Sequence, residues 1–479
     1  MNNTRSELYL CLDQGGHASR AALFDSEGNM HSLAFRDIAT QRDGSHVEHD
    51  PQELLESLQL AAEELLVDLG DDVTRVVAAG IATQRSSIVC WDRVTGEPLS
   101  PVISWQDRRA ADWLVQFEEQ EPRIHAITGL VLSPHYGVSK LRWCLDHFPE
   151  VAAARESGRL AFGPLASWVA NRLSVQSPLQ ADPANASRTL LWDRQTLDWS
   201  DELLQLFGIP ADCLPQTVPS RHDWGTFSCA GANIPLRVVT GDQSAALFAF
   251  GAPDTGTVYA NLGTGAFLQR CISAPNFDPG RLLASVVYQD GNTAMSVLEA
   301  TINGAGSAIN KFAADAGMEM EHVQAHSSEW LDADAELPLY LNAVSGLGSP
   351  WWLSTMTSGF EGAGSDKQKM AAVIESIAFL IAVNIEAGDR VVGKCTQVLV
   401  TGGLASIDPL LQRIADLTVT TVVRAEMAEA TARGLAYLLA EMPSAWPSVN
   451  VTQTFEAKEN VSLMERFHRW RELMPATNA

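Results

Sequence analysis

Two short glycine-rich turns, one in each half of the chain, constrain the fold more than any other feature of the sequence. The first, Asp13–Arg20 (DQGGHASR), separates the apolar runs Leu8–Leu12 and Ala21–Phe24, and residues 263–265 form a second turn with the same flanking pattern. Short apolar runs on either side of a tight glycine turn predict a β-hairpin. Glycine also lets the backbone approach an anion closely and direct N–H groups at it. The pair of turns therefore predicts a chain that holds a nucleotide polyphosphate.

Length and charge narrow the class of protein. A chain of 479 residues with 46% apolar and 19% charged residues is expected to form two or three globular domains. Its net charge of −25 argues against a general binder of nucleic acid or of anionic membranes, because such proteins need basic surface. An acidic chain can still bind a nucleotide through a few local donors, and the acidity is interpreted as a source of solubility.

Cysteine usage and hydropathy predict a cytoplasmic protein. The seven cysteines are scattered without a CxxC pair or metal-type spacing, as expected for buried, reduced thiols. The first residues, MNNTRSELYLCLD, lack the basic region and long apolar stretch of a signal peptide. No apolar run approaches the roughly 18 residues that span a bilayer, so no membrane association is expected.

Strands and helices alternate along the chain, which predicts an α/β fold. A helix is expected to start at Asp50, where a capping aspartate precedes Pro51 and leucine and alanine then recur at helical spacing from Leu54 to Leu66. Residues 76–81 and 88–91 have the pattern of strands. Arg85 lies between them at a strand end, a place from which side chains often face a cleft.

A third predicted strand, Leu236–Thr240, leads directly into Gly241-Asp242-Gln243 and then into a helix-like run. Asp242 is therefore expected at a helix N-terminus, where it is either a plain N-cap or a catalytic carboxylate. A similar junction of strand and glycine turn occurs at residues 398–403. We place the domain boundary near Gly251, next to the second hairpin.

Taken together, these residues resemble the FGGY carbohydrate kinases, and within them the glycerol kinase branch. The resemblance extends over nearly the whole chain. It rests on ordered blocks that include GIATQRSSIVCWD (80–92), SWQDRRA (104–110), TGLVLSPHYGVSKLRW (128–143), NASRTLLWDRQTLDW (185–199), GDQSAALFAFGA (241–252), NLGTGAF (261–267), GLGSPWW (346–352) and TGGLAS (401–406).

The resemblance implies two ribonuclease-H-like domains of the actin and hexokinase type around a central cleft. Residues 1–250 would bind the acceptor and residues 251–479 the nucleotide. The chain would transfer the γ-phosphoryl group of ATP to a small polyol or sugar, with Mg²⁺ as cofactor. Asp242 would take the proton of the acceptor hydroxyl, and Asp13 and Asp242 would hold the metal. The oligomeric state, monomer, homodimer or larger homo-oligomer, stays open.

The resemblance also assigns the remaining site residues. The acceptor-binding set maps onto Arg85, Ser86, Trp105, His135, Asp242, Gln243 and Phe267. The nucleotide-binding set maps onto Gly15, Gly16, His17, Arg20, Gly263, Thr264, Gly306, Asn310, Gly403 and Leu404.

Three departures from the glycerol kinase pattern bear on the site. Ser86 stands where that branch has glutamate and His135 stands where it has tyrosine, and both concern the acceptor. Gly16 and His17 replace two threonines of the first turn, so hydroxyl donors to the phosphates are missing there while the backbone donors remain. Three interpretations follow: a kinase of a polyol or sugar larger than glycerol, a true glycerol kinase, or a binding protein that kept the fold but transfers weakly. The retained Asp13, Asp242 and Thr264 favour a working kinase, and the widened wall at Ser86 favours the larger acceptor.

Overall fold

Both glycine-rich turns close antiparallel hairpins in the computed structural model, as the sequence predicts. Strand β1 (Leu8–Gln14) pairs with β2 (Ala18–Asp25) across the first turn. Strand β16 (Thr257–Leu262) pairs with β17 (Ala266–Ile272) across the second. In the first hairpin the strands extend past the predicted apolar runs, to Gln14 and from Ala18, so this turn is tighter than those runs indicate, whereas the second turn has the predicted bounds.

The structure describes residues 6–273, 277–332, 337–448 and 450–476, which form two compact units. Unit 1 comprises residues 1–253, 285–296 and 428–448, and unit 2 comprises residues 254–284, 297–427 and 449–479. The chain thus passes from unit 1 to unit 2 at Pro253 and returns twice. The assignment of acceptor binding to residues 1–250 and of nucleotide binding to residues 251–479 stays a prediction.

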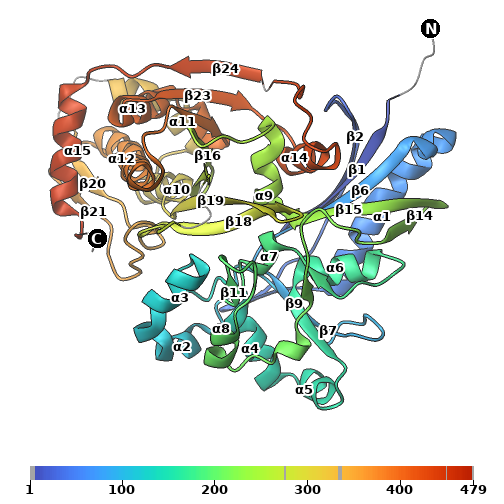
Figure 1. Ribbon diagram of the computed structural model, residues 1–479. Helices are drawn as coiled ribbons and strands as arrows, with labels where there is room; N and C mark the ends of the chain where they lie inside the picture. Colours follow the sequence, from blue (N-terminus) through green and yellow to red (C-terminus); the bar gives the residue numbers. More distant parts are fainter. Residues whose placement is uncertain (1–5, 274–276, 333–336, 449, 477–479) are drawn as a thin grey trace, which may run out of the picture. The chain divides into compact units, whose positions relative to one another are not determined.

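Unit 1 is built on a mixed six-stranded sheet (Figure 1). In sheet order its strands are β14 (Thr226–Cys229), β15 (Ala232–Gly241), β6 (Val76–Thr83), β1, β2 and β3 (Met30–Asp37). Strands β15, β6 and β1 are parallel, whereas β14, β2 and β3 run antiparallel to their neighbours. Every residue of β1 is buried, so this central strand is covered on both faces.

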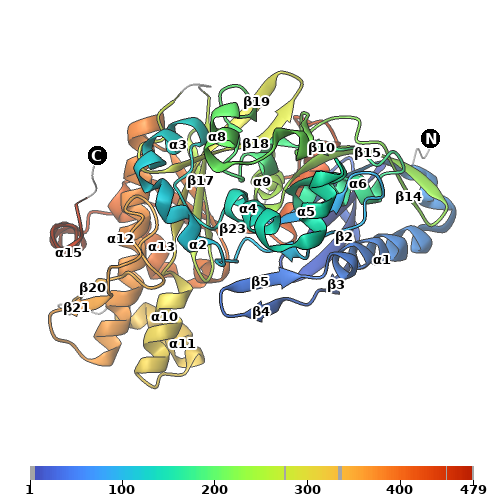
Figure 2. The same cartoon turned by 90° about the horizontal axis from the view of Figure 1, so that it is seen from below.

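Helix α1 (Pro51–Leu69) covers one face of this sheet, where it runs along β2 and β3 (Figure 2). Asp50 caps it as predicted, accepting hydrogen bonds from the backbone N–H groups of Gln52 and Glu53. Its leucines and alanines at helical spacing are buried in one cluster with Leu8, Leu10 and Leu12 of β1. Helix α14 (Ala430–Leu439) packs on β1 and β6 and against α9 (Asp242–Leu247).

The rest of unit 1 surrounds a smaller sheet of five strands. Its strands are, in order, β4 (Gln41–Asp43), β5 (His46–His49), β8 (Val102–Ile103), β7 (Ile88–Asp92) and β9 (Leu160–Pro164). Its helices of eight or more residues are α3 (Glu121–Thr128), α4 (Gly137–His147), α5 (Pro149–Glu156) and α6 (Leu165–Leu173). Shorter helices are α2 (Ala111–Leu114), α7 (Pro183–Ala186) and α8 (Asp201–Phe207).

A second large sheet, of seven strands, repeats the plan of the six-stranded sheet. Its strands are, in order, β18 (Leu283–Asp290), β19 (Thr293–Ile302), β17, β16, β22 (Gln397–Thr401), β23 (Thr421–Glu426) and β24 (Asn450–Phe455). The last five belong to unit 2, whereas most of β18 and the start of β19 belong to unit 1. In both sheets the strand that enters the glycine turn is followed by two parallel strands and then by an antiparallel one. The helices of unit 2 are α10 (Gly306–Asp315), α11 (Met320–Asp332), α12 (Asp366–Val392), α13 (Asp408–Thr418) and α15 (Val461–Leu473).

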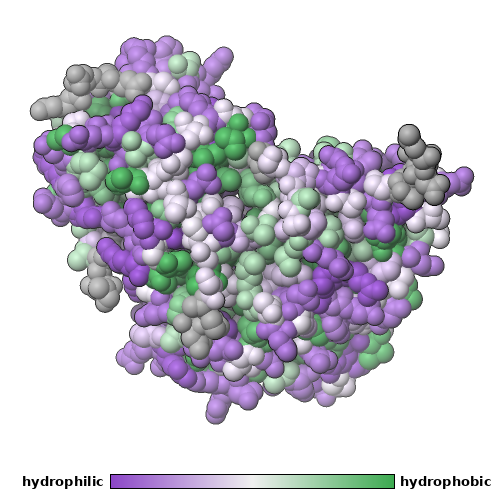
Figure 3. Space-filling view, turned by 45° about the horizontal axis from the view of Figure 1, so that its top comes forward, coloured by the Kyte–Doolittle hydropathy of each residue, from purple (hydrophilic) through white to green (hydrophobic). Residues whose placement is uncertain are grey.

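Helix α12 corrects one expectation from hydropathy. It is long and apolar enough to cross a membrane by length and composition alone, although no such segment was expected. However, 83% of its most apolar window is buried inside the protein, where it joins α13 and the sheet in one apolar cluster. It is therefore a core helix. Hydrophilic side chains cover much of the face shown in Figure 3, with hydrophobic ones in small separate groups.

The structure confirms the α/β class, with a mixed sheet in each unit. All seven cysteines are free, and six of them are buried, as expected for reduced thiols.

The contact between α14 and α9 generates a stability prediction. A Cβ atom at Gly434 would lie 1.8 Å from the carbonyl oxygen of Ala245, so α9 must move if any side chain is added. We expect Gly434→Ala to lower the free energy of unfolding by about 1–3 kcal/mol, the usual cost of overpacking. Chemical denaturation of the purified variant measures this.

Gly388→Ala is the matched control, because Gly388 lies inside α12 and its added Cβ would meet only Leu282, at 3.8 Å. There the higher helix propensity of alanine should raise stability by up to about 1 kcal/mol. Equal effects of the two substitutions would show that α9 and α14 are not in close contact.

Candidate active site

The candidate site of unit 1 forms where three parallel strands end in register. Gln14 of β1 pairs with Thr83 of β6, and Thr83 pairs with Gly241 of β15. Asp13, Arg85 and Asp242 each lie within two residues of these paired positions. Three segments far apart in the sequence therefore bring a carboxylate, a guanidinium and a second carboxylate to one edge of the sheet.

Asp242 is the first residue of α9, but it is not the N-cap of that helix. The cap position is Gly241, which has no side chain, and Asp242 Oδ1 accepts the backbone N–H of Gln243 at 2.7 Å. The capping interpretation is therefore wrong, and the carboxylate is available for another role. A Cβ atom at Gly241 would lie 2.5 Å from Arg85 Cγ, so this glycine makes room for Arg85. Arg85 Nη2 donates to Gln243 Oε1 at 2.6 Å.

Asp13 is buried beside Asp242, which makes the pair attractive to a cation. Only 6% of Asp13 is exposed, and its Oδ1 has no hydrogen-bond partner in the described part of the chain. Burial first, and the nearby Asp242 second, raise the pKa of Asp13 to about 8. Burial also raises the pKa of Asp242, against the opposing charge of Arg85.

This pair fits Mg²⁺, which typically takes one or two protein carboxylates and completes its shell with water and phosphate oxygens. In the described residues no group of three or more His, Cys, Asp and Glu side chains could hold a metal. The described residues therefore provide no metal site made only of protein ligands.

Ser86, Trp105 and His135 lie around the Arg85 segment. Ser86 has a left-handed backbone with φ of 66°, is 3% exposed, and its Oγ has no hydrogen-bond partner among the described residues. The rings of Trp105 and His135 are 5.5 Å apart. Burial lowers the pKa of His135 well below its ordinary range, and the cations of Arg188 and Lys140 lower it further. His135 is therefore a neutral hydrogen-bonding group near pH 7.

The first glycine turn lies next to this cluster. The N–H of Gly15 closes the turn by donating to the Ala18 carbonyl at 3.0 Å, so it shapes the turn and is not free for a phosphate. A Cβ atom at Gly16 would lie 3.7 Å from Trp105 Nε1, and the following His17 is exposed. Arg20 Nε lies 3.4 Å from the Glu429 carboxylate, and its charge opposes the pKa elevation of Asp13.

Unit 2 brings its predicted nucleotide residues together at the end of its own parallel strands. The N–H groups of Gly306 and Ser307 donate to the carbonyls of Gly263 and Thr264, at 3.0 and 2.9 Å, so the second turn lies on the N-terminus of α10. A Cβ atom at Gly306 would lie only 2.8 Å from the Gly263 oxygen. This close approach requires glycine.

The third glycine turn joins the same edge of unit 2. A Cβ atom at Gly402 would lie 2.5 Å from the Leu262 carbonyl oxygen, which places residues 402–404 against the end of β16. Gly403 is exposed and Leu404 is half-buried. Asn310 is exposed one helical turn beyond Gly306, on the same side of α10. The N–H groups of Gly263, Gly306 and Ser307 are used within the second turn and its contact with α10, so a nucleotide would bind through other groups of this edge, which its glycines let a phosphate approach closely.

Phe267 is the one predicted acceptor residue that belongs to unit 2, where it is the second residue of β17 and is 37% exposed. Its role at the acceptor stays a prediction.

Four residues of the site were not predicted from the sequence. Gln84 reaches Gln14 and Gly15, Ser87 accepts the N–H of Trp105, Lys140 contacts the Ser86 and His135 backbone, and Glu429 pairs with Arg20. One signal for Lys140 existed, because a lysine among the apolar positions of a short helix is unusual. Nothing in the local sequence marks Glu429, which comes from the distant start of α14.

Asp13 generates a prediction about pH and stability. Its folded pKa of about 8 lies above the ordinary value of 3.8, so the folded state binds the proton more tightly than the unfolded state. Stability from this group is present at low pH and is lost as the pH rises towards 8, by at most about 1.4 kcal/mol per pH unit. Asp13→Asn, which mimics the protonated acid, should therefore gain stability over the wild type progressively between pH 5 and pH 8.

Thermal melts of both proteins without divalent cations test this. Adding Mg²⁺ should stabilise the wild type more than the variant and reduce the difference, because the cation favours the ionised carboxylate. A difference that does not change with pH would mean that Asp13 keeps an ordinary pKa.

Comparison with known proteins identifies the family. The N-terminal domain of the FGGY family of carbohydrate kinases matches residues 8–249, and the C-terminal domain of that family matches residues 258–441. A glycerol kinase of Dechloromonas aromatica is 35% identical over 451 residues, which cover 91% of this chain and 89% of that protein. A glycerol kinase of Methylobacterium nodulans is 36% identical, with 90% and 89% covered.

Solved structures agree with the fold. The crystal structure of Plasmodium falciparum glycerol kinase with ADP superimposes with a TM-score of 0.87 at 23% identity and covers 99% of both chains. The xylulose kinase of Rhodospirillum rubrum gives a TM-score of 0.86 at 16% identity, with 98% of both chains covered. The matches over both units and the actin-like pair of mixed sheets show that this chain belongs to the FGGY family of carbohydrate kinases, ATP-dependent phosphotransferases with an alcohol group as acceptor.

Proposed function

We propose that this FGGY kinase phosphorylates a terminal hydroxyl of glycerol, with ATP as the donor. The observation that carries the proposal is the cluster of Arg85, Asp242 and Gln243 at one strand edge beside Trp105, since these residues match the glycerol kinase pattern. The two relatives reported above, glycerol kinases of 35% and 36% identity to this chain, support the same acceptor. A binding protein without transfer is not supported, because the family consists of phosphotransferases.

Arg85 and Asp242 suit two neighbouring hydroxyls of a polyol. A guanidinium can donate to two oxygens at once, and an aspartate can accept from two hydroxyls. Gln243, held by Arg85 at 2.6 Å, offers an amide to the same ligand. The Trp105 ring would pack on the carbon chain, as aromatic side chains do in sugar and polyol sites.

Asp242 is the proposed general base. Its carboxylate would accept the proton of the terminal hydroxyl as the hydroxyl oxygen bonds to the γ-phosphorus and the bond to the ADP oxygen breaks. Burial raises the pKa of Asp242, which makes its carboxylate a stronger base, while Arg85 favours the ionised form. The positions of both groups at a rigid strand edge supply the orientation that the transfer needs.

ATP would bind through the glycine turns of unit 2, around Gly263, Thr264, Gly306 and Gly403. Asp13 and Asp242 would hold Mg²⁺, which neutralises phosphate charge when bound. The free thiols support a reducing compartment, and we propose that the protein acts in the cytoplasm.

Asp242→Asn tests the proposed base. The amide keeps the shape of the side chain but cannot accept the proton, so we expect kcat to fall by about 10²–10⁴-fold. Nucleotide binding, measured by calorimetry, should be retained because Asp242 is not among the predicted nucleotide-binding residues.

Asp223→Asn is the control, since Asp223 is an exposed partner of Arg237 in the same unit. It should leave kcat within about twofold of the wild type. An Asp242→Asn enzyme that turns over at a similar rate would remove Asp242 from the mechanism.

A polyol or ketose of four or five carbons is a second candidate acceptor, and Ser86 favours it. A serine here is shorter than the glutamate of glycerol kinases and lacks its charge, which leaves room at the far end of the acceptor. The buried Ser86 Oγ has no hydrogen-bond partner in the described residues, so an additional ligand hydroxyl would satisfy it. His135, neutral and next to Trp105, could bond the same hydroxyl.

Ser86→Glu distinguishes the two acceptors. The added carboxylate would supply a charge-assisted hydrogen bond to the far hydroxyl of glycerol and fill the space needed by a longer chain. We expect the ratio of kcat/KM for glycerol to kcat/KM for a tetritol or pentulose to rise about 10- to 100-fold. An ADP-release assay over a panel of polyols and ketoses measures it.

Ser177→Glu is the matched control, since Ser177 is also a serine with left-handed backbone, φ of 46°, but is exposed on a surface loop. It should not change the ratio. In the wild-type panel, glycerol as the best acceptor supports the first proposal, and a longer acceptor with higher kcat/KM overturns it in favour of the second.

A further inference from the structure

Lys140 has a buried amine that donates to the backbone of two unusual residues of the proposed acceptor wall. It lies on α4 and is 1% exposed. Its Nζ donates to the carbonyl of Ser86 at 2.9 Å and to the carbonyl of His135 at 2.6 Å. Two of the residues at which this chain departs from the glycerol kinase pattern are thus joined through one amine.

The Ser86 carbonyl needs such a partner. A serine with φ of 66° lies in a region that residues other than glycine rarely adopt, and such strain persists only where the surroundings hold it. The carbonyl that follows this strained dihedral is buried, and a buried carbonyl without a donor is costly. The bond from Lys140 fixes it and with it the direction of the Ser86 side chain.

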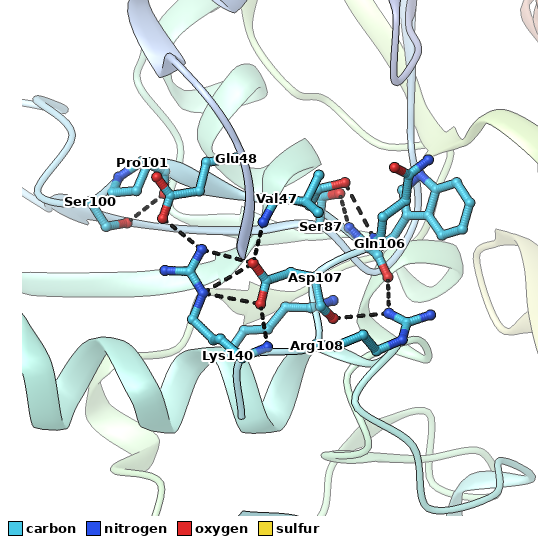
Figure 4. A network of polar contacts seen from close by, with 12 residues as sticks. Val47, Glu48, Ser87, Ser100, Pro101, Gln106, Asp107, Arg108 and Lys140 are labelled. Carbon is cyan, nitrogen blue, oxygen red and sulfur yellow. Dashed lines mark hydrogen bonds and ion pairs between the residues drawn. The ribbon is translucent and has the colours of Figure 1, made fainter. Parts of the chain in front are cut away.

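A carboxylate lies in the same network of polar contacts as the Lys140 amine. Burial, and then the charge of Arg108, lower the pKa of this amine well below its ordinary range, and the charge of Asp107 opposes the shift. Figure 4 shows Lys140 and Asp107 in this network, in which Asp107 accepts the N–H of Val47 at 2.6 Å and pairs with Arg109 at 2.7 Å. Arg109 lies 2.6 Å from Glu48 as well. The carboxylate near Lys140 is therefore held in place by β5 and by the loop after Trp105.

The same loop is tied to the segment of Arg85. Ser87 Oγ accepts the N–H of Trp105 at 3.0 Å and donates to Gln84 Oε1 at 2.9 Å (Figure 4 shows Ser87 beside this loop). Arg108 Nη1 donates to the Trp105 carbonyl at 2.9 Å. Residues 84–87, 105–109 and 135–140 form one connected set, and each of the three segments carries a predicted acceptor residue.

We propose that Lys140 is a positioning residue for the acceptor. Its amine holds Ser86 and His135, on two sides of the proposed acceptor site, at a fixed distance from each other and does not contact the substrate. The proposal rests on the acceptor site proposed above. Support of α4 alone would not need an amine, because Gly137 and Val138 already anchor the start of that helix by donating to the carbonyls of Arg188 and Thr189. An apolar side chain of equal length would pack there without the cost of burying an amine.

Lys140→Met is the test, because methionine keeps the length of the side chain and removes the amine that makes both hydrogen bonds. We expect the KM of the best acceptor to rise about 10- to 100-fold while the KM of ATP stays within about twofold. The preference between acceptors of different length should also decrease, because the wall loses its fixed geometry. In a variant that is folded by circular dichroism, an acceptor KM within about twofold of the wild type overturns the proposal.

Asn171→Leu is the matched control. Asn171 is 4% exposed and its Nδ2 donates to the carbonyls of Ser177 and Pro178, at 2.8 and 3.2 Å, so it also ties two loop carbonyls in unit 1. A lower melting temperature with an unchanged acceptor KM is expected. An increase in acceptor KM as large as that of Lys140→Met would show that any such loss has this effect, and would overturn a specific role for Lys140.

If Lys140→Met does not fold, Lys140→Gln replaces it, because glutamine keeps an amide donor without the amine. An acceptor KM between those expected for the wild type and for loss of both donors supports the proposal, and an unchanged KM overturns it. All measurements use the acceptor that proves best for the wild type. A wrong choice of glycerol therefore shows in the wild-type panel, whereas failure of the positioning role shows only in the variants.

Discussion

The register of three parallel strands is the constraint on which the unit 1 site depends. Gln14, Thr83 and Gly241 are paired across β1, β6 and β15, so the chain leaves all three strands at the same level. Asp13, Arg85 and Asp242 meet for that reason alone. A shift of one residue in any pairing would turn the side chains of that strand to the other face of the sheet. The core leucines of β1 and α1 prevent such a shift, because they would have to leave the apolar cluster.

Local patterns predicted the elements that meet at this edge but not all of the contacts between them. Turn chemistry and alternation predicted both hairpins, and capping predicted the start of α1 at Asp50. The same capping rule gave a wrong prediction at Asp242, because the N-cap position is occupied by Gly241. The absence of a side chain at Gly241 leaves room for Arg85. The contacts of Lys140 and Glu429 could not be predicted, because each joins segments that only the folded sheet brings together.

The glycine turns of the two units are built in the same way. In each, a strand enters a glycine turn, and the N–H of the first glycine closes that turn, from Gly15 to Ala18 and from Gly263 to Gly265. In each, a second glycine admits a close neighbour, with Gly241 next to Arg85 and Gly306 next to Gly263. The sequences of the two halves share little beyond these glycines. What the two halves share is therefore a close approach of neighbouring groups to the backbone at these glycines, which a residue with a Cβ atom would prevent.

The chain is acidic overall, but basic side chains are buried around the proposed acceptor residues. This difference affects how the proposed acceptor wall could recognise a ligand. The chain carries a net charge of −25, yet Arg85, Lys140 and Arg188 are buried basic residues around the acceptor residues. Arg188 is itself fixed, by a 2.8 Å bond to Ser285 and by stacking on Tyr136. Burial, and then the nearby cations, lower the pKa of His135, so its imidazole is neutral near pH 7. The Ser86 hydroxyl has no hydrogen-bond partner among the described residues. A neutral imidazole and this hydroxyl would recognise hydroxyl groups by hydrogen bonds, so we expect selectivity at the proposed acceptor wall to depend on chain length and hydroxyl position and not on ligand charge.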